Sequence, residues 1–248
     1  MSTKNFKMTI QYDGTSLHGW QVQKNGRTVQ GELENALQKI FRNQKINLIG
    51  SGRTDSGVHA FGQIANIKLD TDMDMDLLLN AVNGNLKSYD IAVTNIDEVS
   101  HDFHSRFSAL KREYVYMIST EYSPIGRDYY WNIQEKMDID KLHDCAKLVI
   151  GEHDFTQLSK KNSEIDNKIC NVNLSEWKIA ENKIYYKIIA NRFLHHMVRY
   201  LVGSMIEVSK DRLFTINKFH SMIKGKVREQ IFRAPSRGLY LKKIYYVS

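Results

Sequence analysis

Hydrophobic and polar residues follow two different periods in the first part of the chain. Residues 6–12 alternate between apolar and polar side chains and run into Asp13 and Gly14, so they predict a strand that ends in a turn. After Thr28, a favourable N-cap, apolar residues recur every three or four positions to Phe41, which predicts a helix. Further strands are predicted at 46–49, 64–69 and 91–96, and a helix after the aspartates of 70–76.

The same succession of elements then begins again. Glu113–Ser119 alternates as a strand, and a helix with Asp138 or Asp140 at its N-cap follows it. This pattern indicates an α+β protein of two related halves, residues 1–100 and 101–248, which share or abut their sheets. The remaining predicted elements are a strand at 184–190, helices at 193–208 and 216–224, and a strand at 239–247.

Basic residues outnumber acidic ones, and the excess is concentrated near the end of the chain. The 248 residues carry a formal net charge of +7. Residues 208–248 hold ten basic and two acidic side chains, whereas the remainder of the sequence is nearly balanced. A cationic excess of this kind favours a polyanionic partner, and we expect the C-terminal basic residues to face phosphate groups.

Several classes of protein are excluded by composition. No apolar run approaches the roughly 18 residues of a membrane span, and the first residues lack the apolar core of a secretion signal. Cys145 and Cys170 are solitary, so they offer neither a disulfide framework nor a zinc ribbon. Free thiols suit a reducing compartment, and we expect a soluble, cytoplasmic protein that does not bind a membrane.

The segment from Gly50 to His59 is rich in glycine and in chemically active side chains. Its glycines permit a tight, exposed loop, and the loop carries Arg53 and Asp55. It is not a phosphate-binding loop, because no Gly-Lys-Ser or Gly-Lys-Thr ends it. Two interpretations stay open here: a loop that presents Asp55 for catalysis, or a hairpin in which Asp55 caps the turn.

A single cation lies in the most apolar predicted helix. Arg199 is the only permanently charged residue between Arg192 and Glu207. A buried Arg needs a carboxylate partner, so we expect an Asp or Glu from elsewhere in the chain to meet it. The neighbouring His195 and His196 are adjacent rather than one helical turn apart, which makes a poor metal site, and no metal is expected.

Aromatic and basic residues are interleaved just after residue 100. The segment consists of Phe103, His104, Ser105, Arg106 and Phe107, and Tyr114 lies on the strand that follows. Such residues stack on bases and pair with phosphates in RNA-binding proteins. An ordinary strand with a solvated edge has the same composition, so the pattern alone does not decide between them.

These segments together resemble the TruA family of tRNA pseudouridine synthases. The central match is Gly52-Arg-Thr-Asp-Ser-Gly-Val-His-Ala60, and the resemblance continues in one order over nearly the whole chain. The other matching parts are Tyr12-Asp-Gly14 with Gly19-Trp-Gln21, Phe103-His-Ser-Arg-Phe107 with Tyr114, Gly151-Glu-His-Asp-Phe155, His195-His-Met-Val-Arg199 with Gly203, and Gly238-Leu-Tyr-Leu241.

The resemblance implies a more detailed fold. The two halves would be ferredoxin-like, or RRM-like, with mostly antiparallel sheets that join into one extended sheet. Helices would cover one face, and the active-site cleft would lie between the halves. Residues 1–100 would carry the loop with the catalytic aspartate, and residues 101–248 the tyrosine, the arginine and the basic RNA-binding surface.

The resemblance also implies roles for individual residues. Asp55 is the catalytic carboxylate, and Arg199 pairs with it, so the loop supplies the partner that the helix needs. Arg53 helps to hold the loop or the RNA backbone. Tyr114 packs on the target base, and Leu241 forms a wall of the substrate site. The residues expected to bind tRNA are Phe103, His104, Ser105, Arg106 and Phe107.

The implied reaction is the isomerisation of uridine to pseudouridine in the anticodon stem-loop of tRNA, at positions 38–40. The N-glycosidic bond breaks, the uracil turns, and C5 rejoins C1′, so neither a metal nor a nucleotide cofactor is expected. Asp55 acts either as a nucleophile or by removing a sugar proton, and the sequence leaves both open. The family acts as a homodimer, so a homodimer that binds tRNA is expected here.

Three places depart from the family pattern. Cys170 and Asn171 stand where many members have an Arg-Thr pair, and Leu158-Ser159 lacks the usual second aromatic residue. Met73 lies where some relatives have an Arg. These departures concern tRNA contacts and target positions rather than the chemistry.

Two other classes of function compete with the isomerase. A non-catalytic RNA-binding module would have the stacking residues, but binding alone has no need of a buried ion pair beneath an exposed loop. An Asp-dependent hydrolase would need a second carboxylate near Asp55, and residue spacing identifies none.

Overall fold

The computed structural model describes residues 3–86, 89–160, 166–210, 214–226 and 232–247. The chain forms two compact units. Unit 1 comprises Met1–Leu110 together with Tyr240–Ser248, and unit 2 comprises Lys111–Leu239. Within the described ranges, no helix is long and apolar enough to cross a membrane.

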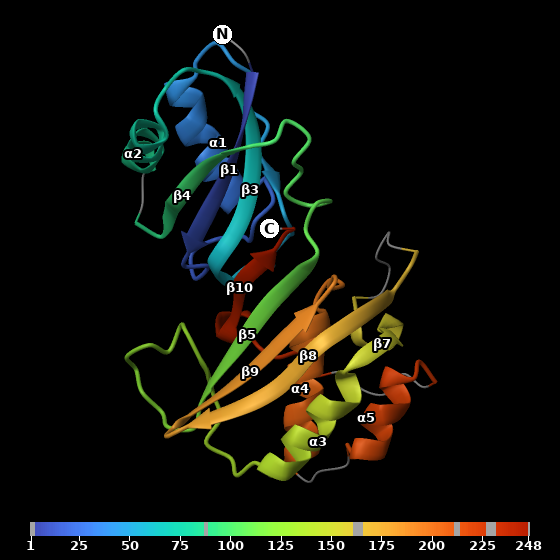
Figure 1. Cartoon of the computed structure of the whole chain (residues 1–248). Helices are drawn as coiled ribbons and strands as arrows, with labels where there is room; N and C mark the ends of the chain where they lie inside the picture. Colours follow the sequence, from blue (N-terminus) through green and yellow to red (C-terminus); the bar gives the residue numbers. More distant parts are fainter. Residues whose placement is uncertain (1–2, 87–88, 161–165, 211–213, 227–231, 248) are drawn as a thin grey trace. The chain divides into compact units, whose positions relative to one another are not determined.

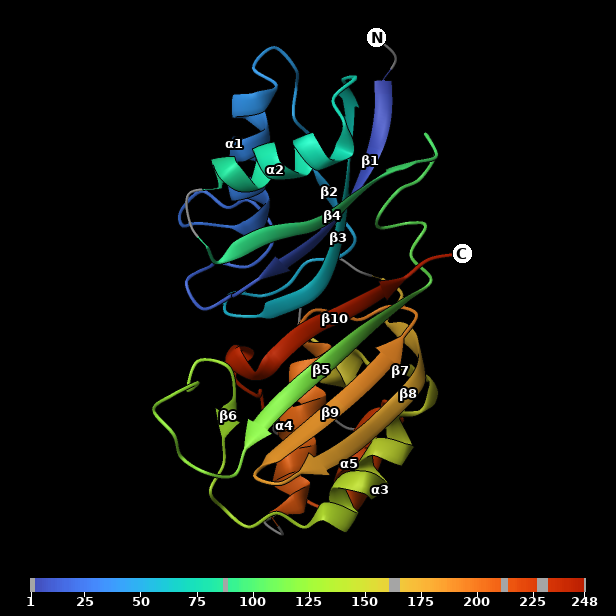
Figure 2. The same ribbon diagram turned by 60° about the vertical axis from the view of Figure 1, so that its left-hand side comes forward.

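Unit 1 is a mostly antiparallel sheet with two helices on one face (Figures 1 and 2). The sheet order is β4-β1-β3-β10, and β2 pairs with β3. Strand β1 runs antiparallel to both β3 and β4, and the last strand, β10, runs parallel to β3. The elements are β1 (Thr3–Tyr12), α1 (Val29–Ile40), β2 (Ile49–Gly50), β3 (His59–Asp70), α2 (Met75–Asn85), β4 (Ile91–Val99) and β10 (Leu239–Tyr245).

The core of unit 1 follows from the periods seen in its sequence. Phe6, Met8 and Ile10 point from β1 to the same side, and each is at most 1% exposed. They are covered by the apolar stripe of α1, where Leu33 and Leu37 are fully buried. Thr28 caps α1 as predicted, because its side chain accepts a hydrogen bond from the N–H of Gly31.

Unit 2 repeats the plan of unit 1. Its sheet has the order β5-β9-β8-β7, with β6 parallel to β5, and three helices pack on one face (Figure 2). Both units combine a mostly antiparallel sheet with helices, so the α+β class is confirmed. The elements are β5 (Lys111–Ser119), β6 (Trp131–Asn132), α3 (Ile139–Val149), β7 (Gly151–Asp154), β8 (Ile169–Ala180), β9 (Lys183–Ala190), α4 (Met197–Ser209) and α5 (Ile216–Ile223), with 3₁₀ turns η1 (Thr156–Leu158) and η2 (Ser236–Gly238).

The boundary between the units differs from the predicted division after residue 100. The segment that follows β4 stays with unit 1, because the side chain of Asn5 donates hydrogen bonds to the carbonyls of Ser100 and Phe103. The C-terminal residues also return to unit 1, where Tyr240 pairs with His59 and Leu241 with Ala60. Long-range pairing of this kind leaves no trace in local composition.

Three predicted elements have different bounds in the structure. Strand β2 occupies Ile49–Gly50 instead of 46–49, and β3 already begins at His59 instead of residue 64. The helix predicted at 193–208 begins only at Met197. His196 has a left-handed backbone conformation, with φ of 64°, and a residue in that conformation cannot continue a helix.

Candidate active site

The loop that carries Asp55 is held by its backbone. We define the Asp55 loop as residues 51–58, which connect β2 to β3. At its start, the N–H of Ser51 donates to the carbonyl of Ile64 (2.8 Å), and the side chain of Gln63 donates to the carbonyl of Gly52 (2.9 Å). Near its centre, the hydroxyls of Tyr12 and Thr54 lie 2.8 Å apart. Backbone and side-chain hydrogen bonds therefore hold both the start and the centre of the loop in place.

The chain after β1 supports the Asp55 loop at a distance that only glycine allows. A Cβ atom on Gly14 would lie 2.1 Å from the carbonyl oxygen of Val58. Gly19 has a φ of +84°, and a Cβ there would lie 2.5 Å from the carbonyl oxygen of Thr54. The N–H of Trp20 donates to that same Thr54 carbonyl (3.2 Å). This contact explains why Tyr-Asp-Gly and Gly-Trp occur together with the Asp55 loop.

Gly14→Ala tests this support. The added methyl group would collide with backbone atoms rather than with a flexible side chain, so we expect a loss of about 1–3 kcal/mol in the free energy of unfolding. Pseudouridine formation should fall along with it. The matched control is Gly84→Ala in α2, where a Cβ meets nothing within 4 Å. Thermal unfolding of both variants measures the difference, and equal stabilities would contradict the account.

The loop ends on a buried histidine. His59 is 2% exposed, and its Nδ1 accepts a hydrogen bond from the N–H of Gly14 (3.0 Å). Its ring stacks on that of Tyr240, with the centroids 4.7 Å apart, and Phe61 stacks on Tyr240 as well (5.0 Å). His59 thus connects the Asp55 loop to the segment after β1 and to β10. The side chain of Asp55 itself is half-buried, and that of Arg53 is exposed.

The interleaved aromatic and basic segment is anchored by two buried asparagines. Asn66 donates to the side-chain oxygen of Asn5 (3.0 Å) and accepts from the N–H of Ser105 (2.9 Å). Ser105 is fully buried, and its hydroxyl donates to the carbonyl of Ile49. Sequence analysis missed this pair, because alternation assigns Asn5 to the strand face opposite Phe6 and Met8, and Asn66 to the face of the exposed Lys68. Ser105 therefore holds the segment from within.

The other side chains of this segment face outwards. Phe107 is 77% exposed, and the guanidinium of Arg106 lies 5.6 Å from its ring centroid. The Nδ1 of His104 accepts from the N–H groups of Arg106 and Phe107, which fixes a tight turn. Phe103 is half-buried and packs on Tyr246, with the centroids 5.0 Å apart. A cation and an aromatic ring are thereby presented side by side.

Tyr114 lies on β5 in unit 2. Its half-buried ring makes an edge-to-face contact with Phe193, with the centroids 5.0 Å apart and the planes at 83°. Aromatic pairs in this geometry are held in orientation by their quadrupoles. Leu241, by contrast, belongs to unit 1, where it is paired with Ala60 in the parallel register of β10 and β3.

Arg199 lies in the first turns of α4 and is 9% exposed. Its Nε donates to the carbonyl of Ala234 (2.8 Å), and the N–H of Ala234 donates back to the carbonyl of Arg199 (3.0 Å). Gly203 allows this approach one turn later, because a Cβ there would lie 2.1 Å from the carbonyl oxygen of Phe232. The guanidinium is therefore oriented by the chain that passes over α4.

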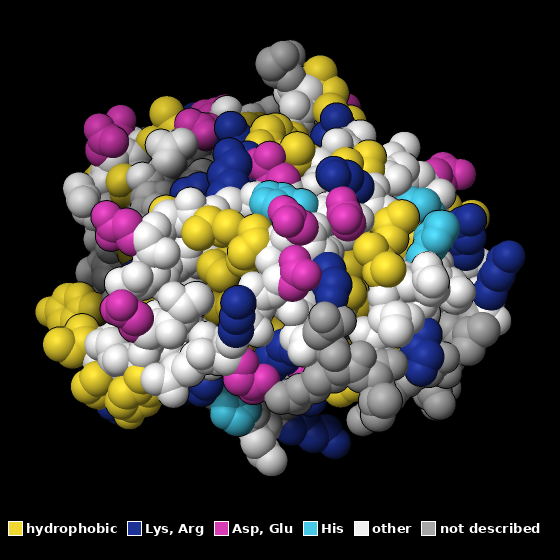
Figure 3. Space-filling view, turned by 90° about the horizontal axis from the view of Figure 1, so that it is seen from below, with side chains coloured by type: hydrophobic (Ala, Val, Ile, Leu, Met, Phe, Trp, Pro, Cys, Tyr) yellow, Lys and Arg dark blue, Asp and Glu magenta, His cyan; other side chains and the backbone are white. Residues whose placement is uncertain are grey.

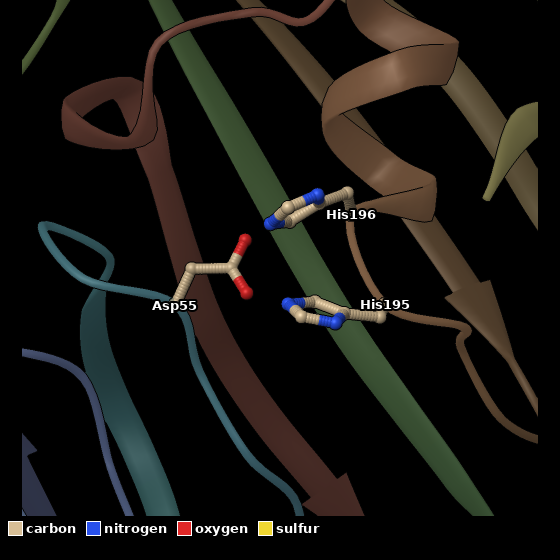
Figure 4. A group of neighbouring side chains, drawn as sticks. All are labelled: Asp55, His195 and His196. Carbon is tan, nitrogen blue, oxygen red and sulfur yellow. The ribbon is translucent and has the colours of Figure 1, made fainter. Parts of the chain in front are cut away.

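His195 and His196 come from the segment that leads into α4 (Figure 4). Their ring centroids are 4.1 Å apart, and His196 also contacts Tyr200 edge-on (5.8 Å). Asp55, which is also shown in Figure 4, lies on the Asp55 loop of unit 1.

The cysteines and buried tyrosines are poorly suited to acid–base or nucleophilic work. Burial raises the pKa of Cys145 to about 12 and also raises that of Cys170. Burial raises the pKa of Tyr116 and Tyr186 above the usual range as well. The hydroxyl of Tyr116 is engaged in donating to the carbonyl of Pro235 (2.8 Å).

The C-terminal basic residues do not gather on one element. Lys210 is largely buried, and it pairs with Glu135 (3.3 Å) and Glu207 (3.4 Å). Lys242 and Lys243 belong to unit 1, whereas Lys210 and the other described basic residues of 208–248 belong to unit 2. Figure 3 shows a face on which Lys and Arg side chains are interspersed with Asp and Glu. Arg212 and Arg228 are among the ten basic residues of 208–248, but they lie outside the described residues.

Two of the three departures from the family pattern include a fully buried residue, although Asn171 is exposed. Leu158 and Cys170 are fully buried in unit 2, and Cys170 pairs with His153 between β7 and β8. Met73 is half-buried ahead of α2. Leu158 and Cys170 therefore act through the packing of unit 2 rather than by presenting a side chain to a ligand.

Comparison with known proteins gives a consistent result. A sequence profile described as tRNA pseudouridine synthase matches residues 8–108 and 145–247. The chain is 37% identical to tRNA pseudouridine synthase A of Bacillus pumilus over 97% of its own length and 98% of that protein. It is 38% identical to tRNA pseudouridine synthase A of Brachyspira hyodysenteriae, with 98% of each chain covered.

Solved structures give only a distant likeness. A chain of a Cbf5–Nop10–Gar1 complex aligns with a TM-score of 0.35 and 12% identity, over 82% of this chain. This chain spans about half of the length of that one (54%). The profile and the curated relatives cover both units, including the Asp55 loop and α4. The chain belongs to the tRNA pseudouridine synthase family, whose members are isomerases that act on tRNA.

Proposed function

We propose that this enzyme converts uridine to pseudouridine at positions 38–40 in the anticodon stem-loop of tRNA, with Asp55 as its catalytic carboxylate. The observation that carries the proposal is the support of the Asp55 loop. Backbone hydrogen bonds and close glycine contacts hold the loop in place, and Asp55 lies half-buried in the middle of it. A catalytic group needs a preorganised position of this kind.

Asp55 assists cleavage of the N-glycosidic bond. It does so either by attacking C1′ as a nucleophile or by removing a proton from the sugar, and both need an ionised, oriented carboxylate. The freed uracil turns and rejoins C1′ through C5, so atoms and oxidation states balance without an added metal or nucleotide cofactor. Water must be kept away while the bond is broken, because hydrolysis would compete with rejoining.

The other site residues are assigned by what the reaction demands. Arg199 serves as the cation that holds Asp55 ionised, and Arg53, which is exposed, contacts the RNA backbone or steadies the loop. The target uridine has to leave its stack, and the ring of Tyr114 packs on the extruded base, with Leu241 as an apolar wall. The edge contact with Phe193 fixes the plane that Tyr114 offers to the base.

A separate group of residues, the Phe103–Phe107 segment, is proposed to bind parts of the tRNA other than the reacting base. Phe103, His104, Arg106 and Phe107 supply stacking surfaces and a cation, and Ser105 anchors them from inside unit 1. We also propose a homodimer that works in the cytoplasm on its tRNA substrate. In that arrangement the anticodon arm of the tRNA crosses both protomers.

Tritium release from tRNA labelled at C5 of its uridines tests the proposed positions. The C5 hydrogen is lost when C5 becomes the glycosidic carbon, so wild-type enzyme should release tritium from unmodified tRNA. Replacement of the uridines at 38–40 by cytidine should abolish the release, whereas replacement of uridines elsewhere in the tRNA should not. Undiminished release from the 38–40 variant would contradict the positions while leaving the reaction itself intact.

A further inference from the structure

Unit 1 contains a hollow that the proposed chemistry does not use. Its volume is about 480 Å³, and it is lined by the segment that leads into β2, by β2 and β3, and by the segment that follows β4. The polar lining includes Lys45, Lys68 and His101, and the aromatic lining is Phe103 and His104. The remaining lining residues are Asn47, Ile49, Asn66, Ile67 and Asp102.

Two cations of the hollow lack a carboxylate partner. Lys45 and Lys68 are both exposed, and neither is within ion-pair distance of an Asp or Glu in the parts of the chain that the structure describes. On the neighbouring strand β1, in contrast, Lys4 pairs with Glu98 (3.1 Å) and Lys7 with Asp97 (3.0 Å). The same sheet thus neutralises one set of lysines and leaves the other available to a ligand.

The charged and titratable groups that line the hollow carry a net positive charge, which favours an anionic ligand. The Nζ of Lys68 lies 3.1 Å from Nδ1 of His101, so the ammonium donates and the imidazole accepts. Asp102 contributes one negative charge at the exposed rim. Two lysines against one carboxylate leave a net positive charge, which suits a phosphodiester better than a small dianion.

The wall of the hollow is rigid and partly aromatic. The amide of Asn66 is already engaged with Asn5 and Ser105, so it holds the wall in place. Phe103 is half-buried and is packed from behind by Tyr246 (5.0 Å). A preformed hollow with an aromatic side and adjacent cations is the combination used to bind single nucleotides of an RNA chain.

The hollow is distant from Asp55, because Asp55 lies at the His59 end of its loop, where its carbonyl accepts a hydrogen bond from the N–H of Val58 (3.2 Å). Along β3, His59 at the end of the Asp55 loop and Asn66 in the hollow are separated by seven residues, which is roughly 23 Å at the usual rise of a strand. A nucleotide in the hollow therefore cannot be the uridine that is isomerised.

We propose that this hollow binds one nucleotide of the tRNA substrate away from the target uridine, with its phosphate between Lys45 and Lys68. The inference rests on the proposed function, because it takes tRNA as the ligand. It adds an anchoring site that lies beside the Phe103–Phe107 segment and contributes to affinity rather than to the chemical step.

The test compares Lys45→Ala/Lys68→Ala with wild type and with Lys39→Ala, which removes an exposed lysine of α1 outside the hollow. We expect the double variant to bind tRNA about tenfold more weakly and to lower the slope of log K against log salt by about 1–2. Lys39→Ala should bind like wild type. The single-turnover rate of pseudouridine formation at saturating enzyme should be unchanged in all three proteins.

Ethylation interference then identifies the phosphate. One or two phosphates whose ethylation weakens the binding of wild type should have no effect on the double variant. Unchanged tRNA affinity of the double variant, or a lowered single-turnover rate with normal affinity, would overturn the inference. Failure of the proposed function is seen separately, because it would leave wild-type protein without tritium release from tRNA, whatever the lysine variants do.

Discussion

Asp55→Asn is expected to eliminate pseudouridine formation while leaving the protein folded and able to bind tRNA. Asn has nearly the same shape as Asp, but its amide is neither a base nor a nucleophile at neutral pH. Removing a group that transfers a proton costs about 10²–10⁴-fold in rate, and removing a nucleophile costs more, so we expect a loss of at least about 10³-fold. Tritium release measures the rate, and filter binding measures the affinity for tRNA.

The fold should tolerate this change. The hydrogen bonds that hold Ser51, Gly52 and Thr54 come from backbone groups and from the side chains of Gln63 and Tyr12, and Asp55→Asn leaves all of these groups unchanged. The matched control is Asp72→Asn, an exposed aspartate of unit 1 outside the loop, which should keep full activity. An Asp55→Asn enzyme with activity within tenfold of wild type would remove Asp55 from its proposed role.

Arg199→Met is expected to have the second-largest effect, on both activity and stability. Met fills a similar volume but leaves the buried carbonyl of Ala234 without the hydrogen bond from Arg199, and an unsatisfied buried acceptor costs about 1–3 kcal/mol. If Arg199 also holds Asp55 ionised and oriented, the rate should fall by about 10²-fold or more, as for other groups that orient a charged catalyst. Thermal unfolding and tritium release measure the two effects.

A second variant separates the two roles of Arg199. Arg199→Lys keeps the charge but loses the planar fork of donors, so we expect it to recover part of the rate without recovering the hydrogen bond to Ala234. Arg233→Met, an exposed Arg next to Ala234, is the matched control and should resemble wild type. If Arg199→Met were fully active and stable, Arg199 would have neither role.

Sequence periodicity predicts those elements whose buried face is regular. Strand β1 and helices α1 and α3 were predicted in this way, and their caps Thr28 and Asp138 accept the expected backbone hydrogen bonds. Strand β8 was missed. Its buried residues are at even positions up to Val172 and at odd positions from Ser175, because the register shifts between Val172 and Leu174. A bulge of this kind breaks alternation even where the strand continues.

The candidate site residues can be named from the sequence, and their roles stay predictions, whereas the contacts that support them cannot be named from it. Asp55, Arg199 and Tyr114 stand out because each residue type conflicts with its local pattern or matches a family motif. The supports depend on pairs far apart in the chain, such as Asn5 with Asn66, or β10 with β3. Gly14 and Gly19 can be recognised in the sequence as motif residues. The reason why glycine is needed there, the close approach of the Val58 and Thr54 carbonyls, is seen only in the structure.

The most direct test of the central claim uses an anticodon-arm RNA with a single uridine, at position 39, and an excess of enzyme. Product nucleosides are identified after one turnover for wild type and for Asp55→Asn, under conditions in which both bind all of the RNA. The account predicts that wild type converts the uridine to pseudouridine without releasing free uracil, and that Asp55→Asn leaves the bound uridine unchanged. Pseudouridine formed by Asp55→Asn at the wild-type rate, or free uracil released by wild type, would contradict it.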